Sequence, residues 1–199
     1  MHGFWVFVTD CGDSALTLPL ALLMLVFLMA ARERRLALAW LLAAGGCAAA
    51  IGGLKLIFGA CGRFLPLMPI ASPSGHTAMS SVIYGSLALL IGASLPVRLR
   101  IPLYAASGFG VGLIGVSRMV LREHSLAEVA IGWLVGGAAC CFFGLMVERV
   151  QAQPPVLRLR WLLLLAALAA AVLHGRRWTP EPAIHHLAWH FRLLLPWCR

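Results

Sequence analysis

Long apolar runs dominate this sequence and restrict what it can fold into. A helix needs about 20 apolar residues to cross the hydrocarbon core of a bilayer, and such runs fill most of the 199-residue chain. Of its residues, 61% are hydrophobic and 12% are charged, whereas soluble domains carry about 25% charged residues. The predicted transmembrane helices cover residues 15–31, 36–58, 76–95, 101–121, 126–147 and 161–174.

The connections between these runs are short, which predicts a single membrane-embedded domain over residues 1–199. Its predicted fold is an all-α, integral-membrane bundle of six transmembrane helices. Near the C-terminus, apolar residues recur at helical spacing, with His185, Trp189 and Arg192 off the apolar stripe. This pattern is typical of a helix that lies in the membrane interface. Residues 180–199 are therefore predicted to form a C-terminal interfacial segment.

Arginine clusters predict how the bundle is oriented. The chain has 16 Lys and Arg against 7 Asp and Glu, but these clusters lie between apolar runs, as topology signals do, and do not indicate a nucleic-acid surface. The loops after the first, third and fifth runs contain Arg32, Arg34, Arg35, Arg98, Arg100, Arg149, Arg158 and Arg160. Excess arginine marks the cytoplasmic face, although Arg176 and Arg177 fall on the other side. We expect a bacterial inner-membrane protein whose remaining loops face the periplasm.

Three groups of polar residues converge on that outer face. They are Lys55 with Arg63, the segment 72–77, and Ser117, Arg118, Arg122, His124 and Glu128. Ionisable residues at the edge of membrane spans are costly and are functional candidates by default. Cations beside a helix N-terminus favour a phosphate or a similar oxyanion. No acidic cluster suited to Mg²⁺ or Ca²⁺ is evident, so the sequence predicts a phosphoryl-transfer site without metal or cofactor.

His124 and Glu128 supply a candidate nucleophile for such a site. Glu128 follows His124 by four residues, which places both on one face of a helix. Its carboxylate can hold one imidazole nitrogen protonated while the other nitrogen attacks phosphorus. His76 then remains to protonate the leaving oxygen.

Two segments match short motifs of a known membrane-enzyme family. Residues 73–76, Pro-Ser-Gly-His, match the second motif of the type-2 phosphatidic acid phosphatase superfamily without change. Residues 117–124 match the Ser-Arg-x5-His part of its third motif, and Lys55 stands upstream like the lysine of its first motif, Lys-x6-Arg-Pro. The chain therefore resembles this family over residues 55–128, with the six-span bundle around them.

The resemblance implies a phosphatase that acts through a phosphohistidine intermediate. By position, it assigns His124 as the nucleophile, His76 as the general acid and Glu128 as the residue that orients His124. The phosphate-binding residues that it implies are Lys55, Arg63, Ser74, Gly75, Ser117 and Arg118.

The sequence departs from the family pattern at two places. Seven residues separate Lys55 from Arg63, one more than the motif has, and Phe64 replaces its proline. Glu128 stands where the family usually has Asp, and its extra methylene changes the reach of the carboxylate. We expect the orienting role of Glu128 to survive this change.

The expected function is a lipid phosphatase that removes a terminal phosphate from a lipid phosphate or a polyprenyl diphosphate. Two alternatives remain open: a lipid phosphotransferase that uses the same site, and a non-enzymatic anionic-lipid transporter. Transporters often contain repeats with broken helices, and no repeat is evident here. The expected partners are the lipid substrate and the bilayer, without nucleic acid, and the sequence leaves the oligomeric state open.

Several residues also have simpler interpretations. Lys55 at the end of its span could extend to the membrane interface without any role in binding. Asp10 and Asp13 are expected to cap the first span. His186 and His190 have a zinc-compatible spacing but no evident third ligand.

Three of the six cysteines, Cys11, Cys61 and Cys198, lie outside the predicted spans. A disulfide among them requires an oxidising compartment. The sequence does not indicate which of them would pair.

Overall fold

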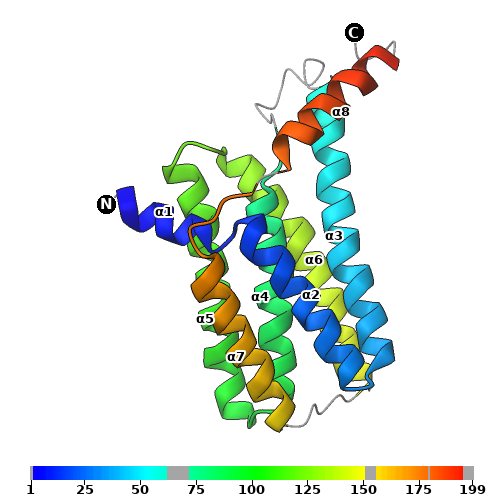
Figure 1. Cartoon of the computed structure of the whole chain (residues 1–199), viewed down its shortest axis with the longest axis vertical. Coiled ribbons are helices and arrows are strands. Elements are labelled where there is room, and N and C mark those ends of the chain that lie inside the picture. Colours follow the sequence, from blue (N-terminus) through cyan, green and yellow to red (C-terminus); the bar gives the residue numbers. More distant parts are fainter. Residues whose placement is uncertain (1, 62–71, 151–155, 179, 195–199) are drawn as a thin grey trace.

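The protein is described by a computed structural model that covers residues 2–61, 72–150, 156–178 and 180–194 (Figure 1). All secondary structure in these residues is helical, which confirms the predicted all-α membrane bundle. The helices are α1 (His2–Asp10), α2 (Ser14–Ala30), α3 (Arg34–Cys61), α4 (Gly75–Ala93), α5 (Val97–Val120), α6 (Leu126–Val150), α7 (Val156–Leu173) and α8 (Glu181–Leu194).

Five helical segments of the described residues are long and apolar enough to cross a membrane. They are His2–Ala30, Arg34–Cys61, Gly75–Ala93, Val97–Val120 and Leu126–Val150. The sixth predicted span corresponds to α7, whose apolar part, Leu159–Leu173, is shorter. At 1.5 Å per residue, that part is about 22 Å long, less than the hydrocarbon thickness of about 30 Å.

Helix α1 precedes the first predicted span and was not predicted. It has only nine residues, too few for the run length by which a span is recognised. A turn at Cys11 and Gly12 separates it from α2, and it packs against α5. The N-terminal segment therefore lies at the end of the bundle where α2, α4 and α6 begin (Figure 1).

Helix α4 lies at the centre of the bundle and packs against α2, α3, α5 and α6. Its first turn lies very close to α6 at Gly132, where an added Cβ would lie 2.7 Å from the Ser74 carbonyl oxygen. Small residues permit such close helix packing in membranes. This contact sets the start of α6, which carries Glu128, against the start of α4.

The buried apolar and polar residues separate along the bundle. The apolar core runs between α2, α3, α4, α6 and α7 and includes the edge-to-face pair Trp40 and Phe143, with ring centroids 5.5 Å apart. Buried polar residues concentrate where α2, α4 and α6 begin and α3 and α5 end (Figure 1). They include Asp10, Asp13, Lys55, Ser74, Thr77, Ser117 and Glu128. The predicted polar groups therefore share one end of the bundle.

Helix α8 covers part of this end and packs against α3. It lies within the predicted interfacial segment, and its Leu187, Trp189 and Phe191 are exposed. That these residues lie in the membrane interface remains a prediction. Of the cysteines outside the predicted spans, Cys61 is disulfide-bonded and Cys11 is a free thiol, while Cys198 lies outside the described residues.

Candidate active site

The start of α4 presents backbone donors to the polar end of the bundle. Ser74 is the N-cap, and its buried hydroxyl oxygen accepts hydrogen bonds from the Thr77 backbone N–H (3.4 Å) and the Thr77 hydroxyl (2.9 Å). The first N–H groups of a helix have no partner within the helix and favour anions. A Cβ on Gly75 would lie 3.8 Å from the Lys55 Nζ, so the ammonium group lies beside this first turn.

Glu128 joins three segments through its carboxylate. One oxygen accepts the backbone N–H of Ser72 (2.7 Å), and the other accepts the N–H of Ser125 (2.9 Å) and contacts His124 Nδ1 (3.2 Å). The Glu128 carbonyl also accepts the Ser74 N–H (3.1 Å). One buried side chain thus ties the segment before α4 to the turn before α6.

His124 lies in the short turn between α5 and α6. Arg122 adopts a left-handed conformation there (φ 60°), and the Arg118 carbonyl accepts the N–H groups of Glu123 (3.0 Å) and His124 (3.3 Å). The chain therefore turns back sharply at the end of α5. As a result, the imidazole of His124 reaches Glu128 on the first turn of α6.

The environment of His124 favours a neutral imidazole. Burial lowers its pKa, nearby Arg118 and Lys55 act in the same direction, and the hydrogen bond to Glu128 opposes them without reversing the shift. An ionised carboxylate can only accept, so Nδ1 carries the hydrogen in the contact with Glu128. Nε2 then keeps a free lone pair, which is the state that a nucleophilic histidine requires.

His76 is one residue into α4 and has an acidic neighbour that the sequence did not predict. Its Nε2 lies 3.5 Å from Asp13 Oδ2. Asp13 caps α2 as predicted, through the Ala15 N–H (2.8 Å), and also accepts the Trp178 N–H (2.9 Å). Asp10, predicted as a cap, instead pairs with Arg177 Nε at 2.9 Å.

Arg118 holds the opposite side of the site from Lys55. Its guanidinium donates to the Thr9 hydroxyl (3.0 Å) and lies 3.7 Å from Glu123, and its buried Nε has no hydrogen-bond partner among the described residues. Arg118 and His76 line one cavity of about 310 Å³, together with Asp13 and Arg177. A guanidinium facing such a cavity can bind phosphate oxygens.

Lys55 is buried, with 5% of its side chain exposed, and pairs with Glu181 at the start of α8. The pair lines a second cavity, of about 210 Å³, with His76 and Gly75. Burial acts to raise the pKa of Glu181, but the hydrogen bond and charge of Lys55 hold it below its usual value. Lys55, which was predicted to bind a phosphate, is thus paired with a carboxylate in this structure. Sequence reasoning missed it because 126 positions separate the two residues.

The structure brings most of the predicted site residues to one place. His76 lines both cavities, one with Lys55 and the other with Arg118. The charges of both cations lower the pKa of His124. Ser117 differs, because its buried hydroxyl donates to the Ile114 carbonyl of its own helix (2.6 Å). Arg63 lies outside the described residues.

The described parts of the chain contain no set of side chains suited to bind a metal ion. No group of three His, Cys, Asp or Glu side chains there is arranged to hold a metal ion. The exposed His186 and His190 stack on one another, with ring centroids 4.5 Å apart. Two cations, two histidines and a helix N-terminus lie together at one end of a bundle whose helices are long and apolar enough to cross a membrane.

Comparison with known proteins finds a matching family model. Residues 62–152, which are less than half of the chain, match the sequence model of the PAP2 superfamily. The match includes the second and third motifs, and the superfamily supports a phosphoester hydrolase activity.

Two relatives extend the comparison. An uncharacterized 22.5 kDa protein in the cps region of Klebsiella pneumoniae is 29% identical over 158 residues, which cover 79% of this chain and 75% of that protein. A PA-phosphatase related-family protein of Dictyostelium discoideum is 40% identical over 72 residues, which cover 33% of this chain and 22% of that protein. No solved structure matches the chain.

Proposed function

We propose that this protein is a membrane-embedded lipid phosphatase that removes a terminal phosphate from a lipid phosphate or a polyprenyl diphosphate. The observation that carries the proposal is the hydrogen bond between His124 Nδ1 and Glu128, 3.2 Å long, on the same end of the bundle as Lys55 and Arg118. This arrangement leaves the second nitrogen of His124 available for attack on a phosphate held between the two cations.

The proposed reaction has two steps. In the first, His124 Nε2 forms a bond to phosphorus, the bond from phosphorus to the lipid oxygen breaks, and His76 gives that oxygen a proton. Glu128 stabilises the positive charge that develops on His124. In the second, water attacks phosphorus while His76 takes a proton from the water, and the bond from phosphorus to His124 Nε2 breaks, which releases inorganic phosphate. Lys55, Arg118 and the first N–H groups of α4 stabilise the phosphoryl oxygens in both steps.

We further propose that the site faces the periplasm of a bacterial inner membrane. The site lies at the opposite end of the bundle from the arginine-rich turns, which favour the cytoplasmic side. The disulfide-bonded Cys61 lies at the site end, at the last residue of α3. Disulfides persist in oxidising compartments such as the periplasm, which agrees with this orientation.

A phosphate-release assay on the purified full chain in detergent tests the proposal. We expect release of inorganic phosphate from a phosphatidic acid or a polyprenyl diphosphate without an added acceptor, and unchanged rates in a chelator. Strict metal dependence would contradict the mechanism. Transfer of the phosphate to an added acceptor lipid, without release of inorganic phosphate, would indicate a phosphotransferase, and binding without any turnover would indicate a transporter.

A second prediction concerns the carboxylate that holds Lys55. Phosphate must displace or share Lys55 with Glu181, so Glu181→Gln should strengthen inhibition by inorganic phosphate and lower KM, each by about threefold to tenfold. Competitive inhibition kinetics measure both effects. Glu148→Gln, an exposed site on the last turn of α6, is the matched control. An unchanged or higher KM for the Glu181 variant would show that this carboxylate does not compete with phosphate.

A further inference from the structure

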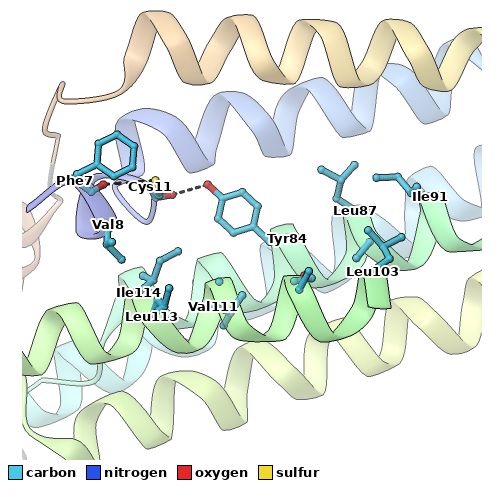
Figure 2. A pocket seen from close by; sticks show the side chains of 14 residues that line it. Phe7, Val8, Cys11, Tyr84, Leu87, Ile91, Leu103, Val111, Leu113 and Ile114 are labelled. Carbon is cyan, nitrogen blue, oxygen red and sulfur yellow. Dashed lines mark hydrogen bonds between the residues drawn. The ribbon is translucent and has the colours of Figure 1, made fainter. Parts of the chain in front are cut away.

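An apolar groove lies along the helices α4 and α5, both of which are candidate membrane spans. We call it the α4–α5 groove, and Phe7, Tyr84, Ile91, Leu103, Val111 and Ile114 are among its walls (Figure 2). Its volume is about 460 Å³. The Tyr84 hydroxyl in it already donates to the Cys11 carbonyl (2.6 Å), so the groove presents mainly hydrocarbon to an occupant.

On α4, the groove continues the face that carries the candidate general acid. Residues three or four positions apart lie on one face of a helix. From His76 downward, this face contains Ser80, Tyr84, Leu87 and Ile91, of which the last three line the groove. His76 therefore lies on the same face of α4 as the residues that line the groove, nearer to the start of the helix.

Helix α5 repeats this arrangement with a cation at the head. From Arg118 toward the other end of the helix, the same spacing selects Ile114, Val111, Ser107 and Leu103, and all four line the groove. Both helices thus carry a phosphate-site residue at the same end and a groove wall along the rest of one face. The groove is the apolar extension of the site into the membrane.

The turn between α1 and α2 lies between the end of the groove and the site. Cys11 lines the groove, and Asp13, two residues later, lies beside His76. Between them, a Cβ on Gly12 would lie 2.7 Å from Ile114 Cγ2 and 3.4 Å from His76 Cβ. The end of the groove and the histidine are therefore separated by the width of a single residue.

The dimensions of the groove suit an alkyl chain. Ile114 and Leu103 are 11 positions apart on α5, which corresponds to about 16 Å along the helix axis. The helix is itself a candidate membrane span. The smaller cavity beside Lys55, of about 210 Å³, is also partly apolar but is bordered by Glu181. It offers less space for a hydrocarbon chain than the groove does.

We propose that the α4–α5 groove binds the hydrocarbon tail of the substrate, an inference that rests on the proposed lipid phosphatase function. A phosphate held between His76 and Arg118 projects its ester chain toward the membrane interior. One end of the groove lies at Ile114, one helical turn from Arg118, and only Gly12 separates it from His76. Burial of each methylene there contributes favourably to binding, so tail length should affect kcat/KM through this groove.

Three glycines with free space around them allow a matched test. Gly110 lines the groove, Gly52 lines the smaller cavity beside Lys55, and Gly112 lines neither. A Cβ at any of the three would meet no heavy atom within 4 Å. Each glycine is replaced by Phe in the full chain. Gly110→Leu is a second variant that fills less of the groove than Gly110→Phe does. The water-soluble substrate p-nitrophenyl phosphate checks that each variant is folded.

Two readouts separate this proposal from the proposed function. The first is kcat/KM for a long-chain and a short-chain phosphatidic acid. The second is the affinity for alkylphosphonates with 16 and 4 carbons, which requires no turnover. Gly110→Phe should weaken both readouts for the long chain by about tenfold or more, the loss expected when about two methylenes leave an apolar site. The short-chain compounds should change less than about twofold.

The possible results distinguish the groove proposal from tail binding in the smaller cavity and from failure of the proposed phosphatase function. Equal losses for long and short chains, or equal effects of Gly110→Phe and Gly112→Phe, would overturn the groove proposal. A chain-length effect at Gly52 alone would place the tail in the smaller cavity, and it too would overturn the proposal. If the wild type releases no phosphate but Gly110→Phe selectively weakens the 16-carbon phosphonate, the groove stands and the phosphatase function fails.

Discussion

Replacing His124 with asparagine should abolish phosphate release while leaving phosphate binding largely intact. The amide can still contact Glu128, but it offers no nucleophilic nitrogen to phosphorus. Loss of a nucleophile in other covalent mechanisms lowers kcat by about 10⁴-fold or more, and we expect a loss of that order here. Steady-state release of inorganic phosphate from a lipid phosphate measures it, with inhibition by added phosphate as the binding readout.

The matched control for this variant is His190→Asn, since His190 is an exposed histidine on α8. Its turnover should remain near that of the wild type. Rapid quenching in alkaline detergent should trap an acid-labile, alkali-stable phosphoenzyme in the wild type and none in the His124 variant. Turnover within about tenfold of the wild type in the His124 variant would contradict its assignment as the nucleophile.

Glu128→Gln should lower kcat by about 10²- to 10⁴-fold, the range seen when the residue that orients a catalytic histidine loses its charge. The carboxylate accepts from two backbone N–H groups and from His124. A glutamine has one acceptor oxygen and would place its NH₂ group against at least one of these donors. Both the orientation and the tautomer of His124 should suffer.

The pH profile separates this effect from simple misfolding. The imidazole must be neutral to attack, so activity falls as pH drops below the pKa of His124. The hydrogen bond to Glu128 acts to raise that pKa, so Glu128→Gln should move the acid limb of kcat/KM to lower pH. Glu128→Asp keeps the charge and should retain more activity than Glu128→Gln. An unmoved acid limb, or wild-type kcat in Glu128→Gln, would exclude the positioning role.

Much of the fold could be predicted because membrane helices follow rules that are local in sequence. Run length identifies a span whatever it packs against, and five predicted spans are helices long enough to cross a membrane. The same rules failed for α1, which is too short to be recognised as a span. They also give no direct information on which helix faces α4.

In the candidate site, too, contacts between residues close in sequence could be predicted, whereas contacts between separate segments could not. The contact of His124 with Glu128 follows from four-residue spacing and is present. The role of Asp13 toward His76 and of Ser72 toward Glu128 had no local signal. Each of these contacts joins residues from separate segments and depends on how closely the helices pack.

Helix positions, the shared polar end and contacts within one helical turn were therefore readable from residue order, since one turn of helix sets them without any neighbour. The ion pair between Lys55 and Glu181, 126 positions apart, and the apolar groove along α4 and α5 exist only once the helices are packed. Their geometry depends on side-chain volumes at the crossings of α1, α3, α4, α5 and α8, and no periodicity in a single segment encodes it.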